Sequence, residues 1–460
     1  MQKSAEKSNI PFVLNASLAS FGAYFCMYAF RKPFSVATFE GMEVFHIDYK
    51  IIVIIAQVLG YALSKFIGIK VVSELKAKQR AYYLLGLILI SELALVLFAL
   101  VPQPYNVVFM FLNGVPLGMI WGIVFSYLEG RKFTEILGVA LSTSFIVSSG
   151  VVKSVGFFVM DSWGFSEFWM PAITGALFVL PLLFFTWLLE KIPKPTQEDI
   201  ELRSERIPMT GKDRKNMLLK FLFPITIWVL FYTFLTAFRD FRDNFSRELW
   251  DTIGYKGDVS VYSSSETLVA FIVLLVLGFT FYFRDNRKAL FFYQFLLLTG
   301  CIALGFSTYL FHTGNLNPFT WMVVSGFGLY ICYVPFNCLF FDRFIGAFRI
   351  KGNAGFLIYL ADAFGYLGSV AVLLYKNFGQ SGLSWIDFFM YSAYLVAGIG
   401  LLVTISSTLY LNEKYKKNKK EGFNGKVGFT TGVGSLWVRK ENLPTIRPQY
   451  TFTPKINPSV

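Results

Sequence analysis

Three basic residues lie within, or at the ends of, long apolar stretches of the sequence: Arg31, Lys65 and Lys153. A charged side chain in the hydrocarbon core of a bilayer costs several kcal/mol unless it faces a partner or a water-filled cavity. Arginine can bind two phosphate oxygens with its planar fork, and lysine adds a compact point charge. Cations gathered on one membrane chain therefore predict a pathway for an anion.

Two acidic residues are candidates for proton coupling or charge balance. Asp362 lies in the run Ala361-Asp-Ala-Phe-Gly-Tyr-Leu-Gly, where it could carry a proton, balance a lysine or form a structural ion pair. Glu129 precedes Gly-Arg-Lys and is predicted to join a charge network at the cytoplasmic end of its span. Both carboxylates are therefore expected near charged partners rather than near lipid.

The sequence carries no signature of an enzyme, a metal site or a cofactor. Its four cysteines fall inside apolar runs without Cys-x-x-Cys spacing, and its two histidines, His46 and His312, form no pair. Metal ligands of these types come at short, regular spacings. A glycine-rich phosphate loop and a nucleophile–base order are also missing. We expect no catalytic residue, no metal and no cofactor.

The composition is that of a membrane protein. Of 460 residues, 55% are hydrophobic and 15% are charged, and the mean hydropathy is +0.54. Soluble domains average about 25% charged residues. The net charge of +13 comes from basic residues in short connections between apolar segments, as membrane orientation requires. Membrane lipids are therefore expected as partners, and nucleic acid is not.

Hydropathy over windows of about 19 residues predicts twelve membrane-spanning helices. These are 11–31, 51–70, 81–101, 106–128, 136–159, 168–190, 221–238, 264–283, 289–311, 319–341, 353–375 and 386–411. The fold class is thus an all-α membrane protein of two pseudo-symmetric six-helix bundles, 1–190 and 221–411. A charged cytoplasmic linker, 191–220, joins them, and a basic, disordered tail, 412–460, follows. Six-helix halves are a transporter architecture that holds substrate at the midplane.

The basic residues are divided unevenly between the two sides of the membrane. Connections 2–3, 4–5, 8–9 and 10–11 and the linker carry lysine and arginine, whereas connections 3–4, 5–6 and 9–10 carry none. The positive-inside rule then places both termini and the linker in the cytoplasm. We expect a multi-pass protein of the plasma (inner) membrane.

Two arginines each have two interpretations. Hydropathy alone places Arg31 at the external surface, where a long side chain reaches water easily; the alternative is a binding site. Arg239 begins the external segment Arg-Asp-Phe-Arg-Asp-Asn-Phe-Ser-Arg-Glu, in which both signs of charge are dense. That segment is either a self-neutralised exposed loop or an extension of the seventh span that points Arg239 into a cavity.

Three short motifs resemble the organophosphate:phosphate antiporters, a branch of the major facilitator superfamily. Tyr28-Ala-Phe-Arg-Lys-Pro-Phe-Ser-Val-Ala is similar to their first helix, and Tyr61-Ala-Leu-Ser-Lys-Phe-Ile-Gly to their second. Phe364-Gly-Tyr-Leu-Gly-Ser-Val-Ala is similar to a motif of their eleventh helix. The resemblance runs over most of the twelve spans and leaves the tail after about residue 420 without a counterpart. It implies the major facilitator fold.

The resemblance also implies roles for individual residues. Arg31 matches the phosphate-binding arginine of the first helix, which is long enough in the family to carry it into a central cavity. Lys65 matches the lysine of the second helix, and Arg239 is the candidate for the arginine of the seventh, with Arg242 as the alternative. The histidine that the glycerol-phosphate carrier has in helix 5 is missing, and Lys153 lies about two turns beyond that position. This departure points to a more anionic substrate.

The sequence therefore predicts a secondary transporter, not an enzyme. It would move a phosphorylated or polyanionic metabolite by alternating access in exchange for phosphate, and the expected oligomeric state is a monomer. The predicted substrate-binding residues are Arg31, Lys65, Arg239, Lys153, Tyr28 and Tyr61. Two alternatives stay open: proton-coupled anion symport through Asp362 or Glu129, and a transporter-like receptor for a phosphorylated ligand.

Overall fold

The computed structural model describes residues 2–128, 131, 133–194, 211–283, 285–348, 350, 354–379, 382–424, 426–431 and 434–439. The chain divides into two compact units, Met1–Ser407 and Thr408–Val460. Glu129 and most of the predicted linker lie outside the described residues. The candidate site lies in the first unit.

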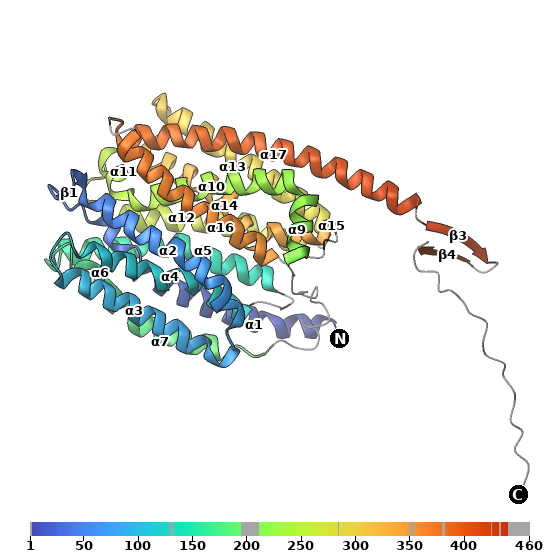
Figure 1. Ribbon diagram of the computed structural model, residues 1–460, viewed down its shortest axis with the longest axis horizontal. Helices are drawn as coiled ribbons and strands as arrows, with labels where there is room; N and C mark the ends of the chain where they lie inside the picture. The colour runs from blue at the N-terminus through green and yellow to red at the C-terminus, as the bar shows by residue number, and fades with distance from the viewer. Residues whose placement is uncertain are drawn as a thin grey trace, which may run out of the picture. The chain divides into compact units, whose positions relative to one another are not determined.

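The first unit consists almost entirely of helices (Figure 1). Its N-terminal half contains α1 (Gln2–Tyr28), α2 (Tyr49–Glu74), α3 (Arg80–Leu100), α4 (Val107–Leu128), α5 (Thr134–Asp161), α6 (Met170–Leu177) and α7 (Val179–Glu190). Its C-terminal half contains α9 (Gly211–Lys220), α10 (Leu222–Asn244), α11 (Ser246–Thr252), α12 (Ser260–Gly278), α13 (Asn286–His312), α14 (Pro318–Cys338), α15 (Phe340–Phe348), α16 (Ala354–Leu374) and the start of α17 (Trp385–Asn424).

Short elements join the helices of the first unit. They are η1 (Pro33–Val36), the antiparallel strands β1 (Glu43–Val44) and β2 (Ile47–Asp48), η2 (Ala77–Gln79), η3 (Phe279–Tyr282) and η4 (Tyr375–Gly379). The β1–β2 hairpin and α11 lie at one end of the helices, and α9 and α15 at the other (Figure 1). We call these the α11 end and the α15 end.

The predicted number of membrane spans is confirmed for the described residues. Eleven helices are long and apolar enough to cross a membrane, and the bent pair α6–α7 makes twelve. The prediction treats 168–190 as one span, but α6 and α7 meet at an angle of 43°. Pro181 explains the bend, because it lacks the N–H that would bond the Leu177 carbonyl and its ring crowds that carbonyl.

The first helix ends earlier than predicted. α1 stops at Tyr28, so Arg31 lies in a turn between α1 and η1 rather than in the span 11–31. Pro33 accounts for this, since it has no N–H to continue the helical ladder. The helix is long, at 27 residues, but its extra length lies at its N-terminal end and does not carry Arg31.

The seventh span extends beyond its predicted end. The prediction stops it at residue 238, whereas α10 continues to Asn244 and buries Arg239, Asp240 and Arg242. The exposed-loop interpretation of this segment is therefore wrong. Hydropathy counts each charge as unfavourable to a membrane span. In the structure, however, Arg239 pairs with Asp240 and Arg242 pairs with Glu266 inside the protein.

The two halves meet along two helix pairs, α2 with α16 and α5 with α12. Small residues make the second contact possible. A Cβ added to Gly150 of α5 would lie 2.3 Å from the Tyr262 carbonyl oxygen of α12. Backbone approach this close needs glycine. The charged residues of both halves meet in the space between these two helix–helix contacts.

The second unit differs from the disordered tail that the sequence predicts. It contains the last part of α17 and an antiparallel pair, β3 (Lys426–Thr431) and β4 (Gly434–Arg439). Lysine and glutamate after Leu411 are good helix formers, which explains why the helix continues to Asn424. Val427 opposite Val438 supplies β-branched residues for the ladder. Residues 440–460 lie outside the described part of the chain.

Candidate functional site

A cavity between the two halves collects most of the predicted site residues. Its lining comes from α1 and the turn after it, α2, α4, α5, α10, α14 and α16: Tyr24, Tyr28, Arg31, Tyr61, Lys65, Trp121, Phe145, Arg239, Tyr333, Asn337, Asp362 and Tyr366. We call it the central cavity. Its volume of about 20 Å³ holds about one water molecule. A metabolite therefore has room in this cavity only if the groups that line it move apart.

Arg31 is buried in the central cavity without an acidic partner. Its side chain is 3% exposed, and its guanidinium carbon lies 3.8 Å from the centre of the Tyr61 ring and 5.8 Å from that of Tyr28. No carboxylate of the described residues lies within 4.0 Å of it, and its Nε has no hydrogen-bond partner. Aromatic faces stabilise a cation only partly, so Arg31 keeps unused capacity to bind an anion.

Two amides hold the turn that presents Arg31. Gln57 of α2 donates from Nε2 to the Arg31 carbonyl at 2.9 Å and to Asn113 Oδ1 at 2.8 Å. Asn113 of α4 donates from Nδ2 to the Phe30 carbonyl at 3.0 Å. The broken helix leaves these carbonyls without backbone partners, and buried carbonyls need one. Neither amide is among the site residues predicted from the sequence, although a polar residue inside a predicted span is itself a signal.

Arg239 reaches the cavity from α10, on the opposite half. Its Nη2 lies 2.7 Å from Asp240 Oδ1 and 3.3 Å from the Tyr366 hydroxyl, and its Nη1 donates to the Tyr333 hydroxyl. Ser369 Oγ donates to the other oxygen of Asp240 at 2.8 Å. The two arginines thus face one space from opposite halves, but Arg239 already has an anion beside it.

Arg242, the alternative to Arg239, is engaged elsewhere. It pairs with Glu266 of α12 and donates from Nη2 to the Met322 carbonyl at 3.2 Å. It is absent from the lining of the central cavity. The geometry therefore assigns Arg239 to the cavity and Arg242 to an ion pair within the C-terminal half.

Lys65 and Asp362 form an ion pair across the two halves. Lys65 Nζ on α2 lies 3.1 Å from Asp362 Oδ2 on α16, and the Tyr232 hydroxyl donates to Asp362 Oδ1 at 2.6 Å. Lys65 also lies over the rings of Tyr61 and Tyr366. Both charges line the cavity, so the pair neutralises one wall and joins the halves.

Lys153 lies outside the lining of the central cavity. Its Nζ is 2.5 Å from Asp243 Oδ1, and Lys32 Nζ is 2.5 Å from Asp243 Oδ2. Lys32 also donates to Asn244 Oδ1 at 2.9 Å. Two lysines of the N-terminal half therefore clamp one aspartate of α10.

A second cross-half pair lies at the same end of the molecule. Lys50, at the start of α2, pairs with Glu248 of α11 and donates to the Ser35 carbonyl at 2.8 Å. We call Lys32, Lys50, Lys153, Asp243 and Glu248 the α11-end clamp. Lys32 and Lys50 were missed in the sequence, where a lysine at the end of a span is unremarkable.

The α15 end carries a more exposed link between the halves. Arg343 Nη2 of α15 lies 2.6 Å from Glu135 Oε2 of α5, and its Nη1 donates to Asn286 Oδ1 at 2.8 Å. The Glu135 side chain is 31% exposed, against 10% for Asp243. Polar contacts therefore join the two halves at both ends, and the more deeply buried ones lie at the α11 end.

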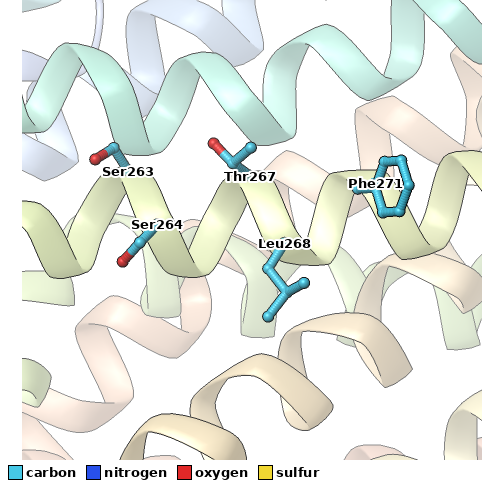
Figure 2. Close-up of a pocket in the computed structure, with 5 residues that line it drawn as sticks. All are labelled: Ser263, Ser264, Thr267, Leu268 and Phe271. Carbon is cyan, nitrogen blue, oxygen red and sulfur yellow. The ribbon is translucent and has the colours of Figure 1, made fainter.

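A second depression lies on α12 (Figure 2). Its lining is Ser263, Ser264, Thr267, Leu268 and Phe271, all from that one helix. Leu268 and Phe271 are exposed, and no charged side chain contributes. This surface therefore lacks the groups that an anion needs.

The fold is that of the major facilitator superfamily. A D-xylose–proton symporter superposes with a TM-score of 0.57 at 16% identity, over 86% of this chain and 96% of that one. The nucleoside transporter NupG gives a TM-score of 0.55 at 14% identity, over 86% and 98%. The inward-open xylose transporter XylE from E. coli gives 0.52 at 13% identity, over 86% and 95%.

Sequence comparison gives the family. Residues 33–414 match DUF5690, a family of unknown function, and the chain belongs to it. No curated protein matches the sequence. The fold matches thus support the predicted architecture, and the organophosphate branch stays a resemblance of motifs.

Proposed function

We propose that this protein is a secondary transporter that exchanges a phosphorylated small metabolite for inorganic phosphate. The observation that carries the proposal is Arg31: a buried arginine with no carboxylate partner in the described part of the chain, facing a cavity between the halves of a major facilitator fold. Its motif, Tyr-Ala-Phe-Arg-Lys, is the one that resembles the phosphate-binding helix of the organophosphate antiporters.

Five residues of the cavity lining have proposed roles in binding. Arg31 and Arg239 bind the phosphoryl oxygens from opposite halves, because a planar guanidinium can hold two oxygens at once. Lys65 adds a positive charge once the halves move. Tyr28 and Tyr61 hold the Arg31 side chain through their ring faces.

Alternating access would use the cross-half ion pairs as reversible closures. Opening at the α11 end requires Lys32 and Lys153 to leave Asp243, and Lys50 to leave Glu248. Opening at the α15 end requires Arg343 to leave Glu135. We propose Lys153 as a closing residue that acts through Asp243 rather than as a direct ligand. The basic connections support a plasma-membrane orientation with both termini in the cytoplasm.

Proton-coupled anion symport is the second candidate. The observation that favours it is Asp362, a carboxylate that lines the cavity and bridges the halves through Lys65. Proton uptake by Asp362 would release Lys65. In that case Asp362→Asn abolishes uptake driven by a proton gradient and leaves phosphate exchange intact. Equal loss of both activities would remove this candidate.

The testing experiment uses the purified full chain in liposomes loaded with labelled phosphate. Sugar phosphates, glycerol phosphate and non-phosphorylated anions are added outside one at a time. We expect one phosphorylated compound to release the label, and protein-free liposomes to retain it. Binding of a phosphorylated compound without release would support a receptor instead. Neither binding nor release for the whole panel would overturn the proposal.

A further inference from the structure

The chain already neutralises two of the three cations that line the central cavity. Arg239 Nη2 lies 2.7 Å from Asp240 Oδ1, and Lys65 Nζ lies 3.1 Å from Asp362 Oδ2. Arg31 has no carboxylate within 4.0 Å among the residues that the structure describes. The cavity therefore holds one excess positive charge rather than three.

We infer that the central cavity selects the monoanionic form of its cargo, and that Asp240 sets this selectivity by neutralising Arg239. The inference rests on the proposed function, since it assumes that a phosphorylated cargo binds there. A buried charge is tolerated when it is compensated, and an uncompensated one is strongly unfavourable. A monoanion makes the loaded cavity neutral, whereas a dianion leaves a net negative charge in it.

Asp240 is the carboxylate that stays with the site. It is 2% exposed, neighbours Arg239 on α10, and accepts from Arg239 Nε at 3.2 Å as well as from Nη2. Ser369 fixes its other oxygen at 2.8 Å. Asp362 instead pairs with Lys65 of the other half, across the contact between α2 and α16. When the halves separate, Asp240 still accompanies Arg239.

The remaining buried charges near α10 lie outside the cavity lining, as Asp240 does, but unlike Asp240 none of them pairs with a cation of that lining. Arg242 and Glu266 compensate one another. Lys32, Lys153 and Asp243 carry one excess positive charge toward the α11 end. These groups are the same in wild type and in a variant at position 240. A comparison between the two chains therefore isolates the charge of Asp240.

The charge of a phosphate ester can be set by pH. A phosphate monoester loses its second proton near pH 6, so the monoanion falls from about one half of the ester at pH 6 to about 1% at pH 8. A sulfate ester keeps one negative charge over this range. If only the monoanion binds, the apparent affinity for the phosphate ester drops roughly 50-fold between pH 6 and pH 8, because apparent affinity scales with the competent fraction.

The experiment measures binding of sugar phosphates, glycerol phosphate and their sulfate esters to the purified full chain at pH 6, 7 and 8. For wild type we expect the roughly 50-fold drop with a phosphate ester, as calculated above, and constant affinity for the matching sulfate ester. In Asp240→Asn a second positive charge is exposed to cargo. We expect the pH dependence for the phosphate ester to shrink to less than about fivefold, because the dianion now binds.

The outcomes separate the inference from the proposed function. Wild-type affinity for a phosphate ester that is constant or rises with pH would overturn the inference while supporting an anion site. A parallel drop for the sulfate ester would assign the pH effect to a protein group and also overturn it. An unchanged pH profile in folded Asp240→Asn would remove Asp240 as the determinant. If Asp240→Asn does not fold, the wild-type comparison of the two esters still decides the selectivity. Absence of binding to any phosphorylated compound would contradict the proposed function itself.

Discussion

Arg31 and Lys32 are neighbours in the chain, and both are buried, yet they belong to two different regions. Arg31 faces the central cavity with no carboxylate within 4.0 Å among the described residues, whereas Lys32 lies 2.5 Å from Asp243 in the α11-end clamp. A buried cation with an acidic partner is explained by the fold alone. One without a partner needs a ligand or water, since a buried isolated charge is costly. Charge pairing thus separates a binding region from a closing region.

The largest expected effect concerns binding in the cavity. Arg239→Ala removes two charge-assisted hydrogen bonds to the cargo, each contributing about 1.5–3 kcal/mol, and leaves Asp240 facing an anion. We expect affinity for a phosphate ester to fall by more than about 100-fold, as measured by calorimetry on purified protein. Arg242→Ala is the matched control on the same helix, and it should retain affinity because Arg242 pairs with Glu266. Equal losses of affinity in both variants would contradict the assignment of Arg239, rather than Arg242, to the cargo site.

The next effect concerns stability of the clamp. Asp243→Asn leaves Lys32 and Lys153 without their shared carboxylate. Removing one partner of a buried ion pair costs about 3–5 kcal/mol, so the midpoint of thermal unfolding should fall clearly below that of wild type. Asn244→Ala, at the next position, removes only a hydrogen bond from Lys32 and serves as control. An Asp243→Asn protein as stable as wild type would show that the clamp does not hold the two halves together.

A smaller effect is expected for Lys153→Ala. Asp243 keeps Lys32 as a partner in this variant, so the loss of stability should be about 1.5–3 kcal/mol, that of one charged hydrogen bond. Affinity for the cargo should change less than threefold, roughly 0.6 kcal/mol, while the exchange rate in liposomes changes more. A large loss of affinity with normal exchange kinetics would instead indicate that Lys153 binds the substrate directly, as the sequence predicts.

The smallest effect is expected at the α15 end. Arg343 is buried but Glu135 is partly exposed, and solvent at the carboxylate screens the pair toward the value of about 0–1 kcal/mol that exposed pairs contribute. Arg343→Ala should therefore lower stability by less than about 1 kcal/mol. Lys50→Ala, which breaks a more buried pair at the α11 end, should lower it further. A larger loss of stability in Arg343→Ala than in Lys50→Ala would show that the α15 end holds the halves together more strongly than the α11 end.

The sequence predicts the helices well because each membrane span is a long, continuous run of apolar residues. It fails where local geometry breaks that pattern. Pro33 ends helical geometry before Arg31, and Pro181 bends the sixth span. Hydropathy also misses the last turn of α10, because its charges are compensated inside the protein: Asp240 pairs with its neighbour Arg239, and Asp243 pairs with Lys153 of α5.

The site residues also differ in how far the sequence alone reveals their contacts. Arg31 and Lys65 stand out in sequence because each interrupts an apolar run, and both line the cavity. Lys153 stands out equally, but its partner Asp243 is 90 residues away in the chain, and no spacing reveals that contact. Gln57 and Asn113 were missed because uncharged amides weigh little in a hydropathy window.

The most direct test of the central claim is labelled phosphate efflux from liposomes that contain wild type, Arg31→Ala or Lys32→Ala, after addition of the best phosphorylated compound. We predict that Arg31→Ala abolishes both exchange and binding while remaining folded. Lys32→Ala should bind the compound with affinity within about threefold of wild type and exchange at an altered rate. Normal binding and exchange in Arg31→Ala would contradict the account, because the unpaired arginine would then have no part in recognising the cargo.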